Sequence, residues 1–579
     1  MKNVNFFYIV RIDVSSNKII YEEITRDSKY LLLGGRGLTS QIVHDEIPPN
    51  CDPLGPENKL IIANGSLTGS PFPNSARTSA GSKSPLTNGI KEANVGGRGA
   101  MMLARHGIRA LALQNNSPEL KIVLITDDGI KLLQGNEYKG LGNYELHRRL
   151  REKYGENVGI YSIGPAGEFM MKAATIAAND LEGYPSRHAA RGGLGAVMGS
   201  KGIKAIVIKP TKESKVKVHD LKKFRETSTP FAKNLAKTKE VFSTFGTPLM
   251  MRAMSEYRGI PTKNFRMGSF DKIANITGEK LHELIMARGG KNRLACSPNC
   301  VIKCSNLIVD EDGNHLTSSL EYETMALNGS NLMIDDLDSL AKIDRLCDDN
   351  GIDTIEFGGT VGVAMDCGKI EWGNDQKVFE ILDKEIRNNT ELGKLYGNGV
   401  KNIGEKLNAK RVPQVKGQGI SGYDPRVFKG MGVTFATSPQ GADHTSGAAI
   451  AGRVASQNKN YGELIENKGK FDLSYELQIY TVVMDSMGCC YFIGPSYENM
   501  ELIAHAINAM YNLNLTRDDV IEIGKNILKI EIKFNEKAGI TQDMNDVPQF
   551  FRDEPSIPSN IKYSFPKEEL KSFWDKLRE

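Results

Sequence analysis

Short apolar runs separated by turns make up the first third of the chain. The runs are rich in Val, Ile and Tyr and are bounded by glycine or polar residues, a pattern that favours strands over helices. We expect strands at 6–12, 18–24, 59–63, 110–113, 121–125 and 204–208. A helix is expected at 38–46, directly after the glycine-rich turn at 34–37. Residues 1–209 are therefore predicted to form a β-rich N-terminal domain.

From residue 210 the pattern changes to apolar residues at helical spacing. A charged stretch at 209–217 separates the two patterns. Helices are expected at 221–235, 278–288, 337–348, 354–367, 376–390, 475–487, 497–511, 517–538 and 567–578. A second break, rich in glycine and proline, lies at 413–425. We predict an α+β protein with a β-rich N-terminal domain (1–209) followed by two mainly helical domains, 210–420 and 421–579.

The composition is that of a large globular protein with balanced charge. A chain of 579 residues exceeds what one hydrophobic core usually serves, so several domains are expected. The 74 basic and 70 acidic side chains give a formal charge of +4, which argues against a nucleic-acid partner held by phosphate neutralisation. No apolar stretch is long enough to span a bilayer, and no cleavable signal follows the start. We expect a cytoplasmic protein.

Three cysteines recur at intervals of four: Cys296, Cys300 and Cys304. Pro298 lacks a backbone N–H and disfavours helix at the residue before it, so we expect a loop here. Three thiolates on one loop and a fourth from elsewhere suit an iron–sulfur cubane, with a structural zinc as second choice. The alternative is three cysteines packed as small apolar residues on a buried helical face. Eight cysteines in so long a chain do not form a disulfide scaffold.

A short motif occurs twice, each time where an amphipathic helix ends. It has Asp, then Gly three positions later, then Asp or Cys two positions after that: Asp348, Gly351 and Asp353, and again Asp485, Gly488 and Cys490. A helix that stops at glycine lets its backbone approach a ligand closely. Two copies could therefore grip two equivalent halves of one ligand, although Asp and Gly are common at helix ends for other reasons. Cys490 would supply the fourth thiolate.

Three glycine-rich stretches in the N-terminal region invite a phosphate-binding interpretation: 34–37, 94–99 and 191–199. Such turns expose backbone N–H groups, and neighbouring arginines can bind phosphate oxygens. A dinucleotide fingerprint that starts at Gly193 is not formed, because its third glycine is needed at position 198 and arrives one residue late, at Gly199. The order Gly199-Ser-Lys201 also reverses the Walker motif. Tight turns within a sheet remain the alternative for each stretch.

Taken together, these features resemble the aldehyde:ferredoxin oxidoreductase family of tungsten and molybdenum enzymes. The markers are Leu-Gly-Gly-Arg-Gly at 33–37, Pro-Glu-Asn-Lys-Leu-Ile-Ile-Ala at 56–63, Lys-Ser-Pro-Leu-Thr-Asn-Gly at 83–89, Ser-Ile-Gly-Pro-Ala-Gly-Glu at 162–168, the cysteine stretch, Glu-Tyr-Glu at 321–323, both Asp-x-x-Gly motifs and Tyr-Asp-Pro-Arg at 423–426. The resemblance runs essentially end to end. It implies a three-domain subunit in which two mainly helical domains cover the β-rich N-terminal base. A metal held by the dithiolenes of two pterins would be buried between the domains, with a [4Fe-4S] cluster beside one pterin.

The resemblance also implies roles for individual residues. The cluster ligands would be Cys296, Cys300, Cys304 and Cys490. The grips on the two pterins would be Asp348, Ile352 and Asp353 on one side and Asp485, Cys489 and Cys490 on the other. The positions associated with pterin phosphate and Mg2+ would be Arg77, Asn94, Gly96, Arg191, Gly192, Leu194 and Gly195. Glu323 and His444 would be the acid–base pair at the metal.

The implied reaction is the oxidation of an aldehyde to a carboxylic acid with water, with electrons leaving through the cluster to ferredoxin or a ferredoxin-like small subunit. Sequence does not distinguish tungsten from molybdenum, and a homo-oligomer is compatible with it. One alternative keeps the cofactors but places the chain in a multi-subunit complex acting on another carbonyl or aromatic acyl substrate. A remote alternative is a non-enzymatic scaffold stapled by zinc. Without the resemblance, Glu323 and His444 would be interpreted as structural residues.

Overall fold

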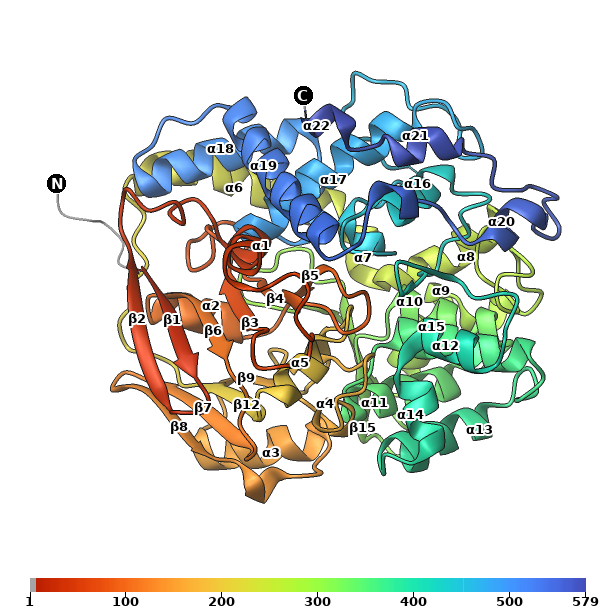
Figure 1. The fold of residues 1–579 in the computed structure, drawn as a ribbon, viewed down its shortest axis with the longest axis horizontal. Helices are drawn as coiled ribbons and strands as arrows, with labels where there is room; N and C mark the ends of the chain where they lie inside the picture. The colour runs from red at the N-terminus through yellow and green to blue at the C-terminus, as the bar shows by residue number, and fades with distance from the viewer. Residues whose placement is uncertain (1–6, 451, 579) are drawn as a thin grey trace.

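Two six-stranded sheets lie face to face in the N-terminal third of the chain, at the lower left of Figure 1. The computed structural model describes residues 7–450 and 452–578. The first sheet has the order β2 (Lys18–Ile24), β1 (Phe7–Asp13), β6 (Ile108–Gln114), β3 (Leu60–Asn64), β4 (Thr78–Lys83) and β5 (Ile90–Val95). The second has the order β11 (Arg187–Ala189), β10 (Ile176–Ala178), β9 (Gly159–Ser162), β12 (Ile203–Ile208), β7 (Lys121–Thr126) and β8 (Gly129–Gln134). Only the pairs β1–β6 and β7–β12 are parallel.

Successive side chains of a strand point to opposite faces of its sheet. Both faces are buried along inner strands such as β3, β6 and β12, whereas the edge strands β2 and β8 are largely exposed or half-buried. In β1, Val10 packs into the core between the sheets, whereas Ile9 packs with residues of α1 (Gly35–Glu46) on the outer face. In β12, Val207 packs against α3 (Asn143–Tyr154) on the outer face of the second sheet. The remaining helices of this region are α2 (Gly99–Arg105), α4 (Pro165–Glu168) and α5 (Leu194–Ser200). The result is a four-layer arrangement with one long helix outside each sheet.

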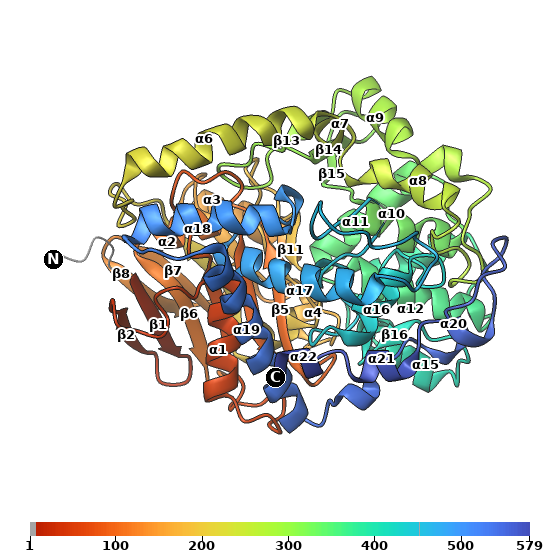
Figure 2. The ribbon, with the colours of Figure 1, turned by 90° about the horizontal axis from the view of Figure 1, so that it is seen from above.

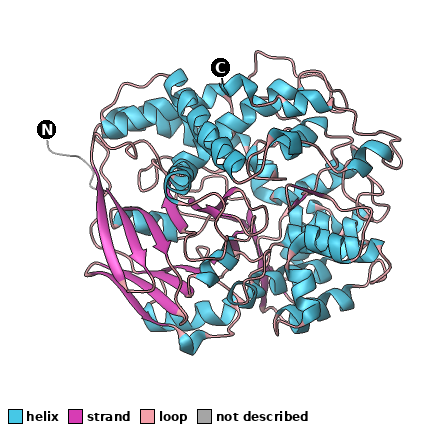
Figure 3. Cartoon of the chain, in the orientation of Figure 1, coloured by secondary structure: helices cyan, strands magenta, loops and turns pink. Residues whose placement is uncertain are grey.

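The rest of the chain is mainly helical, and Figure 3 shows the strands gathered on one side of the molecule. The helices from 221 to 406 are α6 (Leu221–Thr238), α7 (Glu240–Phe245), α8 (Met250–Glu256), α9 (Gly278–Ala287), α10 (Tyr322–Asn328), α11 (Leu337–Asn350), α12 (Thr354–Asp366), α13 (Asp375–Glu380), α14 (Glu391–Gly397) and α15 (Gly399–Lys406). Those after residue 420 are α16 (Lys429–Thr437), α17 (Lys470–Met487), α18 (Tyr497–Tyr511), α19 (Arg517–Lys537), α20 (Gln549–Asp553), α21 (Lys567–Lys571) and α22 (Asp575–Arg578). The predicted α+β class is confirmed.

Short strands interrupt the helical region in two places. A three-stranded sheet consists of β13 (Lys291–Leu294), β14 (Ser305–Val309) and β15 (His315–Ser318), and a two-stranded ribbon of β16 (Gln414–Val415) and β17 (Gln418–Gly419). A single hydrophobic core joins residues from both predicted helical domains, such as Phe357 of α12 and Val483 of α17. The division of the chain at 209 and 420 therefore stays a prediction.

Two predicted helices are wrong in part. The helix expected at 567–578 is broken into α21 and α22, and Phe573 and Trp574 between them pack ring against ring at 4.7 Å. The helix expected at 376–390 begins as α13 but passes into a π-helical turn at Ile381–Ile386 and has ended by Thr390, which caps α14. Phe6, at the start of the first predicted strand, lies outside the described residues. Within the described chain, every helix is too short or too polar to cross a membrane.

Candidate active site

The cysteine stretch forms a loop between β13 and β14, which confirms the prediction made from Pro298. Asn299 and Lys303 adopt left-handed backbone angles, with φ of 62° and 53°, so the loop turns sharply twice. Cys296 and Cys300 are buried, and Cys304 is partly exposed. A backbone that reverses at two points can direct several side chains toward a common centre, which a straight helix cannot do.

Asn74 joins this loop to Cys490, which follows α17. The backbone N–H of Asn74 donates to the Asn299 carbonyl oxygen at 2.9 Å, and its side-chain Nδ2 donates to the Cys300 sulfur at 3.4 Å. The carbonyl oxygen of Asn74 accepts from the Cys490 backbone N–H at 2.8 Å. One asparagine therefore holds the fourth thiol beside the loop that carries the other three.

The electrostatics of the four thiols show that they share one environment. A hydrogen bond with Cys300 lowers the pKa of Cys296 well below its ordinary value, against burial and with help from Arg187 and Arg77. Burial, the nearby Glu321 and the thiols of Cys296 and Cys490 raise the pKa of Cys304. A bound cation or metal cluster would relieve this mutual repulsion, because metal ligation favours the thiolate form.

The two Asp-x-x-Gly motifs have the same backbone geometry. Gly351 ends α11 with φ of 69°, and Gly488 ends α17 with φ of 74°. In each, the glycine N–H donates at 3.2 Å to the carbonyl oxygen of the motif's first aspartate, Asp348 or Asp485. The next N–H donates at 2.9 Å to the carbonyl oxygen five positions back. Both are the left-handed caps that glycine favours, so the sequence echo corresponds to a structural one.

Each of these helix ends rests on a glycine of the N-terminal region. A Cβ at Gly65 would lie 1.9 Å from the backbone nitrogen of Gly488, and a Cβ at Gly164 would lie 2.4 Å from the backbone of Asn350. No larger residue fits at such a distance, so both glycines are needed for close packing of backbone on backbone. This contact positions both motifs against the β-rich base.

The carboxylates at the first helix end are buried and face basic side chains. Asp348 Oδ1 lies 3.0 Å from His188 Nε2. Asp353 caps α12, where it accepts from the Ile355 N–H at 2.9 Å, and its other oxygen lies 3.3 Å from Arg191 Nε. Burial raises the pKa of Asp353 to about 6, although Arg191 acts in the opposite direction. A carboxyl group of this kind can hold or release a proton near neutral pH.

The other residues that the resemblance assigns to pterin binding at the two helix ends, Ile352, Asp485 and Cys489, are also buried. Ile352 forms an isolated bridge with Ala174 of the N-terminal region. Asp485 lies 3.5 Å from Arg36, and burial raises the pKa of Asp485 well above its usual range. Cys489 is fully buried between Gly488 and Cys490.

Glu323 and His444 meet at the centre of the molecule. Glu323 lies in the first turn of α10, and its Oε2 accepts from the Gly422 N–H at 2.7 Å. His444 begins a short 3-10 turn, and its Nε2 lies 3.6 Å from Glu323 Oε1. Both side chains are mostly buried, and the Tyr423 ring centroid lies 6.4 Å from that of His444. This separation exceeds hydrogen-bond length, so a proton could pass between the carboxylate and the imidazole through one intervening water or after a small approach.

A buried ion pair supports His444 from behind. Asp443 Oδ2 lies 2.5 Å from Lys91 Nζ, and Asp443 Oδ1 accepts from the Thr445 N–H at 3.0 Å. Burial alone would raise the pKa of Asp443, but Lys91, Arg191 and His444 outweigh it and hold that pKa far below its usual value. A permanently charged carboxylate next to His444 fixes the turn that carries the imidazole.

The seven residues assigned to phosphate and Mg2+ fall into two groups. Arg77, Asn94 and Gly96 lie on the cysteine side: the Arg77 guanidinium donates to the Asn94 side chain, and a Cβ at Gly96 would lie 3.4 Å from the Cys296 sulfur. The backbone N–H of Arg77 donates to the Gly488 carbonyl oxygen at 3.1 Å. These three residues therefore face the end of α17.

Arg191 and the three residues with it lie beside the end of α11. Gly192, with φ of 83°, approaches Lys91, where a Cβ would lie 2.4 Å from the lysine Cγ. Leu194 is buried at the start of α5, and a Cβ at Gly195 would lie 2.2 Å from the Thr175 carbonyl oxygen. The sequence placed all seven residues in one set, and the structure divides them between the two helix ends.

Many buried polar atoms around these motifs have no hydrogen-bond partner among the described residues. They are Arg191 Nε and Nη1, Asp348 Oδ2, Asp353 Oδ2, Asn94 Nδ2, Glu323 Oε1, His444 Nδ1, Gln440 Nε2 and Ser79 Oγ. Buried polar groups in folded proteins are nearly always satisfied. Their concentration at one place indicates a polar ligand that carries both donors and acceptors, as a pterin with a phosphate does.

A cluster and a single zinc ion place different demands on the spacing of their thiolate ligands. Among residues 7–450 and 452–578, no three His, Cys, Asp or Glu side chains converge closely enough to enclose one metal ion. Tetrahedral zinc requires thiolates about 3.8 Å apart, because each lies about 2.3 Å from the metal. A cubane binds each thiolate through a different iron, so its four ligands stand further apart.

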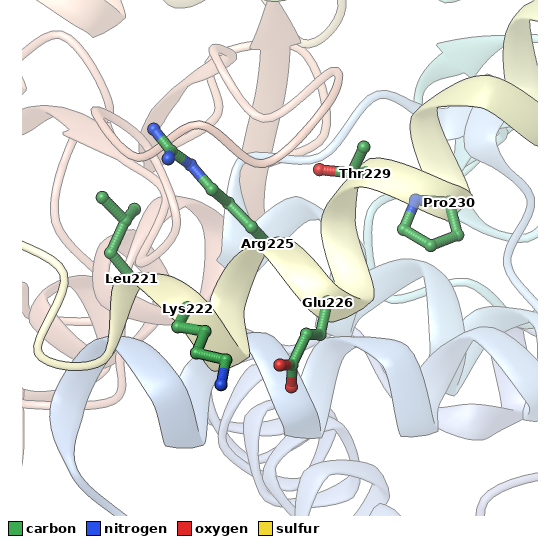
Figure 4. A pocket seen from close by; sticks show the side chains of 6 residues that line it. All are labelled: Leu221, Lys222, Arg225, Glu226, Thr229 and Pro230. Carbon is green, nitrogen blue, oxygen red and sulfur yellow. The ribbon is translucent and has the colours of Figure 1, made fainter.

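An open hollow lies elsewhere, on the first half of α6, and Figure 4 shows the side chains that line it. The lining residues are Leu221, Lys222, Arg225, Glu226, Thr229 and Pro230. None of them is among the buried atoms that lack partners, and the lining contains no cysteine or histidine. The hollow therefore lacks the thiol, imidazole and unpartnered buried polar groups that lie around Glu323.

Several residues at the site were not found by sequence reasoning. Asn74 and Lys91 join distant segments, Asn74 by several hydrogen bonds and Lys91 by one ion pair, and a single Asn or Lys has no periodicity to reveal it. Arg187 lies 3.6 Å from Glu321 and donates to Ser319 and Ser305 beside the cysteine loop. The one available signal was the Asp before His444, because Asp is a common residue at the start of a turn.

Comparisons with known proteins cover almost the whole chain. Residues 9–210 match the family model for the N-terminal domain of aldehyde ferredoxin oxidoreductase, and residues 225–577 match the model for its domains 2 and 3. A tungsten-containing aldehyde ferredoxin oxidoreductase of Pyrococcus furiosus is 30% identical over 576 residues, covering 95% of this chain and 92% of that protein. The WOR-like subunit of an aliphatic sulfonate oxidoreductase from the same organism is 26% identical over 622 residues, covering 97% and 91%.

A solved structure has the same fold. The active site complex BamBC of benzoyl coenzyme A reductase, in complex with 1,5-dienoyl-CoA, matches with a TM-score of 0.82 and covers 100% of this chain and 95% of that one. Its sequence identity of 20% limits the comparison to the fold.

Proposed function

Because the chain belongs to the aldehyde ferredoxin oxidoreductase family, we propose that it is a tungsten- or molybdenum-pterin enzyme that oxidises an aldehyde to a carboxylic acid. The overall step is RCHO + H2O → RCOOH + 2 H+ + 2 e−, with water as the oxygen source. Membership establishes an oxidoreductase of this family. The aldehyde, the cofactor set and the ferredoxin acceptor are the proposal, and the unpartnered polar atoms between the two helix ends are the observation that supports it most directly.

In this proposal the two helix ends hold the two pterins. Asp348, Ile352 and Asp353 grip one, and Asp485, Cys489 and Cys490 grip the other. Arg191 and Asn94 would bind pterin phosphates and associated Mg2+ through their free N–H groups, together with Arg77, Gly96, Gly192, Leu194 and Gly195. The matching left-handed caps of α11 and α17 support a ligand with two equivalent halves.

A [4Fe-4S] cluster would be bound by Cys296, Cys300, Cys304 and Cys490. Support comes from the Asn74 bridge, which holds Cys490 beside the loop, and from the mutual influence of the four thiols on their pKa values. Arg187 and Arg77, next to Cys296, would balance part of the negative charge of four thiolates.

Glu323 and His444 would perform the proton chemistry. When bound, the metal centre supplies the two-electron acceptor. His444, next to the Asp443–Lys91 pair, would donate a hydrogen bond to the substrate oxygen, and Glu323 would take the proton released as water adds. Their burial excludes bulk water from this exchange.

The test is to purify the protein without oxygen, measure its metals and assay aldehyde-dependent reduction of a viologen dye. We expect tungsten or molybdenum, about four irons per chain, and activity that Glu323→Gln lowers by about 10^2- to 10^4-fold without loss of metal. A preparation with iron but with neither heavy metal, and without activity, contradicts the proposal.

A second candidate keeps the cofactors and changes the substrate. The chain is also similar to a subunit of an aliphatic sulfonate oxidoreductase and shares its fold with a benzoyl-CoA reductase complex. In that case the chain would act within a multi-subunit complex on another carbonyl or aromatic acyl substrate. Purification from the native source separates the two, because a stable partner that carries additional clusters favours the complex.

A further inference from the structure

The cysteine loop approaches the molecular surface beneath α7. Cys304 is partly exposed, whereas Cys296, Cys300 and Cys490 are buried. A Cβ at Gly246, the residue after α7, would lie 2.7 Å from the Cys304 carbonyl oxygen. The Ser243 hydroxyl in α7 donates to the Lys303 carbonyl oxygen at 3.3 Å. In Figure 2, α7 lies beside β13 and β14, the strands that flank the loop. This is where four thiols come nearest to solvent.

Apolar side chains are exposed at the same place. Val241 of α7 is 60% exposed and Val454 is 46% exposed. The partly buried Phe242 packs its ring 4.6 Å from that of Phe492, two residues after Cys490. Exposed apolar side chains with a polar border mark sites of protein contact.

The polar border is strongly basic. The segments 231–245, 291–304 and 452–460 carry eight basic residues and one acidic residue, Glu240, in a chain that is almost neutral overall. The basic residues are Lys233, Lys237, Lys239, Lys291, Arg293, Lys303, Arg453 and Lys459. Lys291 and Lys459 are paired with Glu182 and Glu476. Among the described residues, Lys237, Lys239, Lys303 and Arg453 have no acidic partner within 4 Å.

Two of these cations, Lys239 and Arg453, lie near each other and near Cys490. Arg453 stacks on the Tyr491 ring at 4.9 Å, directly after Cys490. Burial and the neighbouring Arg453 lower the pKa of Lys239, and Cys490 acts in the opposite direction. Unpaired charges of one sign create a field that attracts an oppositely charged partner and accelerates its association.

We propose that the surface formed by Lys237, Lys239, Val241, Phe242, Lys303 and Arg453, here the α7 surface, docks an acidic, ferredoxin-type one-electron carrier. The inference rests on the proposed function, since it requires a redox centre at the four cysteines. Aldehyde oxidation releases two electrons, so each turnover reduces two one-electron carriers, one after the other. Each must dock and leave, which suits a small, charge-guided contact rather than a large apolar one.

The test compares two charge-reversed variants on the same helix axis. Lys237→Glu/Lys239→Glu changes the α7 surface. Lys222→Glu/Lys223→Glu makes the same change in charge at the other end of α6, about 25 Å away. None of these four residues belongs to the proposed catalytic or cofactor-binding set. Both variants should fold and keep their iron and heavy metal.

Three measurements are made on the holoenzyme without oxygen. The first is the Kd for a purified acidic [4Fe-4S] ferredoxin at low and high salt. The second is the rate of electron transfer to that ferredoxin after the enzyme has been reduced chemically and freed of reductant. The third is aldehyde-dependent reduction of saturating viologen, a small dye that needs no docking. Cytochrome c, a basic protein acceptor, serves as the probe of opposite charge.

We expect the Lys237/Lys239 variant to raise the Kd for ferredoxin at least about tenfold at low salt and to lose most of its salt dependence. Transfer from the pre-reduced variant slows at limiting ferredoxin, whereas reduction of cytochrome c becomes faster. The Lys222/Lys223 variant stays within about twofold of the native protein. Viologen reduction stays within about twofold in both variants.

An unchanged Kd and transfer rate in the Lys237/Lys239 variant would contradict docking on the α7 surface. An equal loss of ferredoxin affinity in the Lys222/Lys223 variant would contradict it as well. Salt-independent binding overturns it as well. A native protein that transfers electrons to ferredoxin in the expected charge-dependent way, but shows no aldehyde–viologen activity, supports the surface and contradicts the proposed substrate. The two proposals therefore fail in different measurements.

Discussion

The end of α11 carries two carboxylates, and each faces a basic side chain. Asp348 lies 3.0 Å from His188, and Asp353 lies 3.3 Å from Arg191. The end of α17 has the same backbone cap but carries a thiol, Cys490, where α11 is followed by Asp353. The two helix ends thus share a backbone cap and differ in the residue two positions after its glycine, Asp353 or Cys490. One end offers charge to the proposed ligand, and the other offers a sulfur that connects it to the cysteine loop.

The largest effect should follow from removing that sulfur. Cys490→Ser is expected to abolish the [4Fe-4S] cluster, because oxygen is a poor substitute for a cluster thiolate. Iron content and the brown colour should fall to near zero, and electron transfer to any protein acceptor should stop. The matched control is Cys489→Ser, one position earlier, which should keep its iron. Equal iron loss in both variants would show that the two thiols are not distinguished as we propose.

A smaller effect separates the two glycine caps. Gly351→Ala should lower the free energy of unfolding by about 1–2 kcal/mol, the cost of a left-handed backbone for a residue with a Cβ. Gly488→Ala should cost about 2–5 kcal/mol, because its Cβ would also lie 2.5 Å from the Thr68 hydroxyl and 2.9 Å from the backbone of Gly65. Chemical denaturation of both variants measures the difference. Equal costs would mean that the base packs on the two ends equally tightly.

The smallest effect concerns pH. Burial raises the pKa of Asp353 to about 6, so the folded protein without cofactor keeps a proton there that the unfolded chain releases near pH 4. The free energy of unfolding should therefore fall as pH rises from about 4 to about 6, by at most about 3 kcal/mol, and this group adds no slope above that range. Asp353→Asn should remove that part of the slope. A variant with the native pH profile would show that Asp353 is ionised throughout.

Sequence patterns predicted the parts of the fold that rest on local signals. Lys18–Ile24 and Tyr497–Tyr511 were predicted with the bounds that the structure has, because alternation and helical spacing are strong there. The strand at Thr78–Lys83 was missed, since its small polar residues show no apolar alternation although all six are buried. The helix predicted at 567–578 is broken where Phe573 and Trp574 turn into the core, a tertiary effect.

The candidate site likewise contains residues that local sequence patterns predicted and residues that they missed. Cys296, Cys300, Cys304 and the two helix-end motifs were visible because their spacing repeats within a few residues. Lys91 pairs with Asp443, a partner far away in the sequence, and only the folded chain brings them together. Asn74 makes its contacts partly through its backbone, which no side-chain pattern encodes. Residues that act by joining segments lie beyond what a single sequence reveals.

The Asn74 bridge has a consequence for how the protein is made. The ribosome completes Cys304 long before it reaches Cys490, and at 5–20 residues per second the intervening 186 positions (490 − 304) take roughly 10–40 s. During that interval a nascent chain would carry three of the four proposed cluster ligands and would lack the fourth, Cys490. A cluster bound by the four proposed ligands could therefore be completed only on a chain whose synthesis has passed Cys490, close to its end.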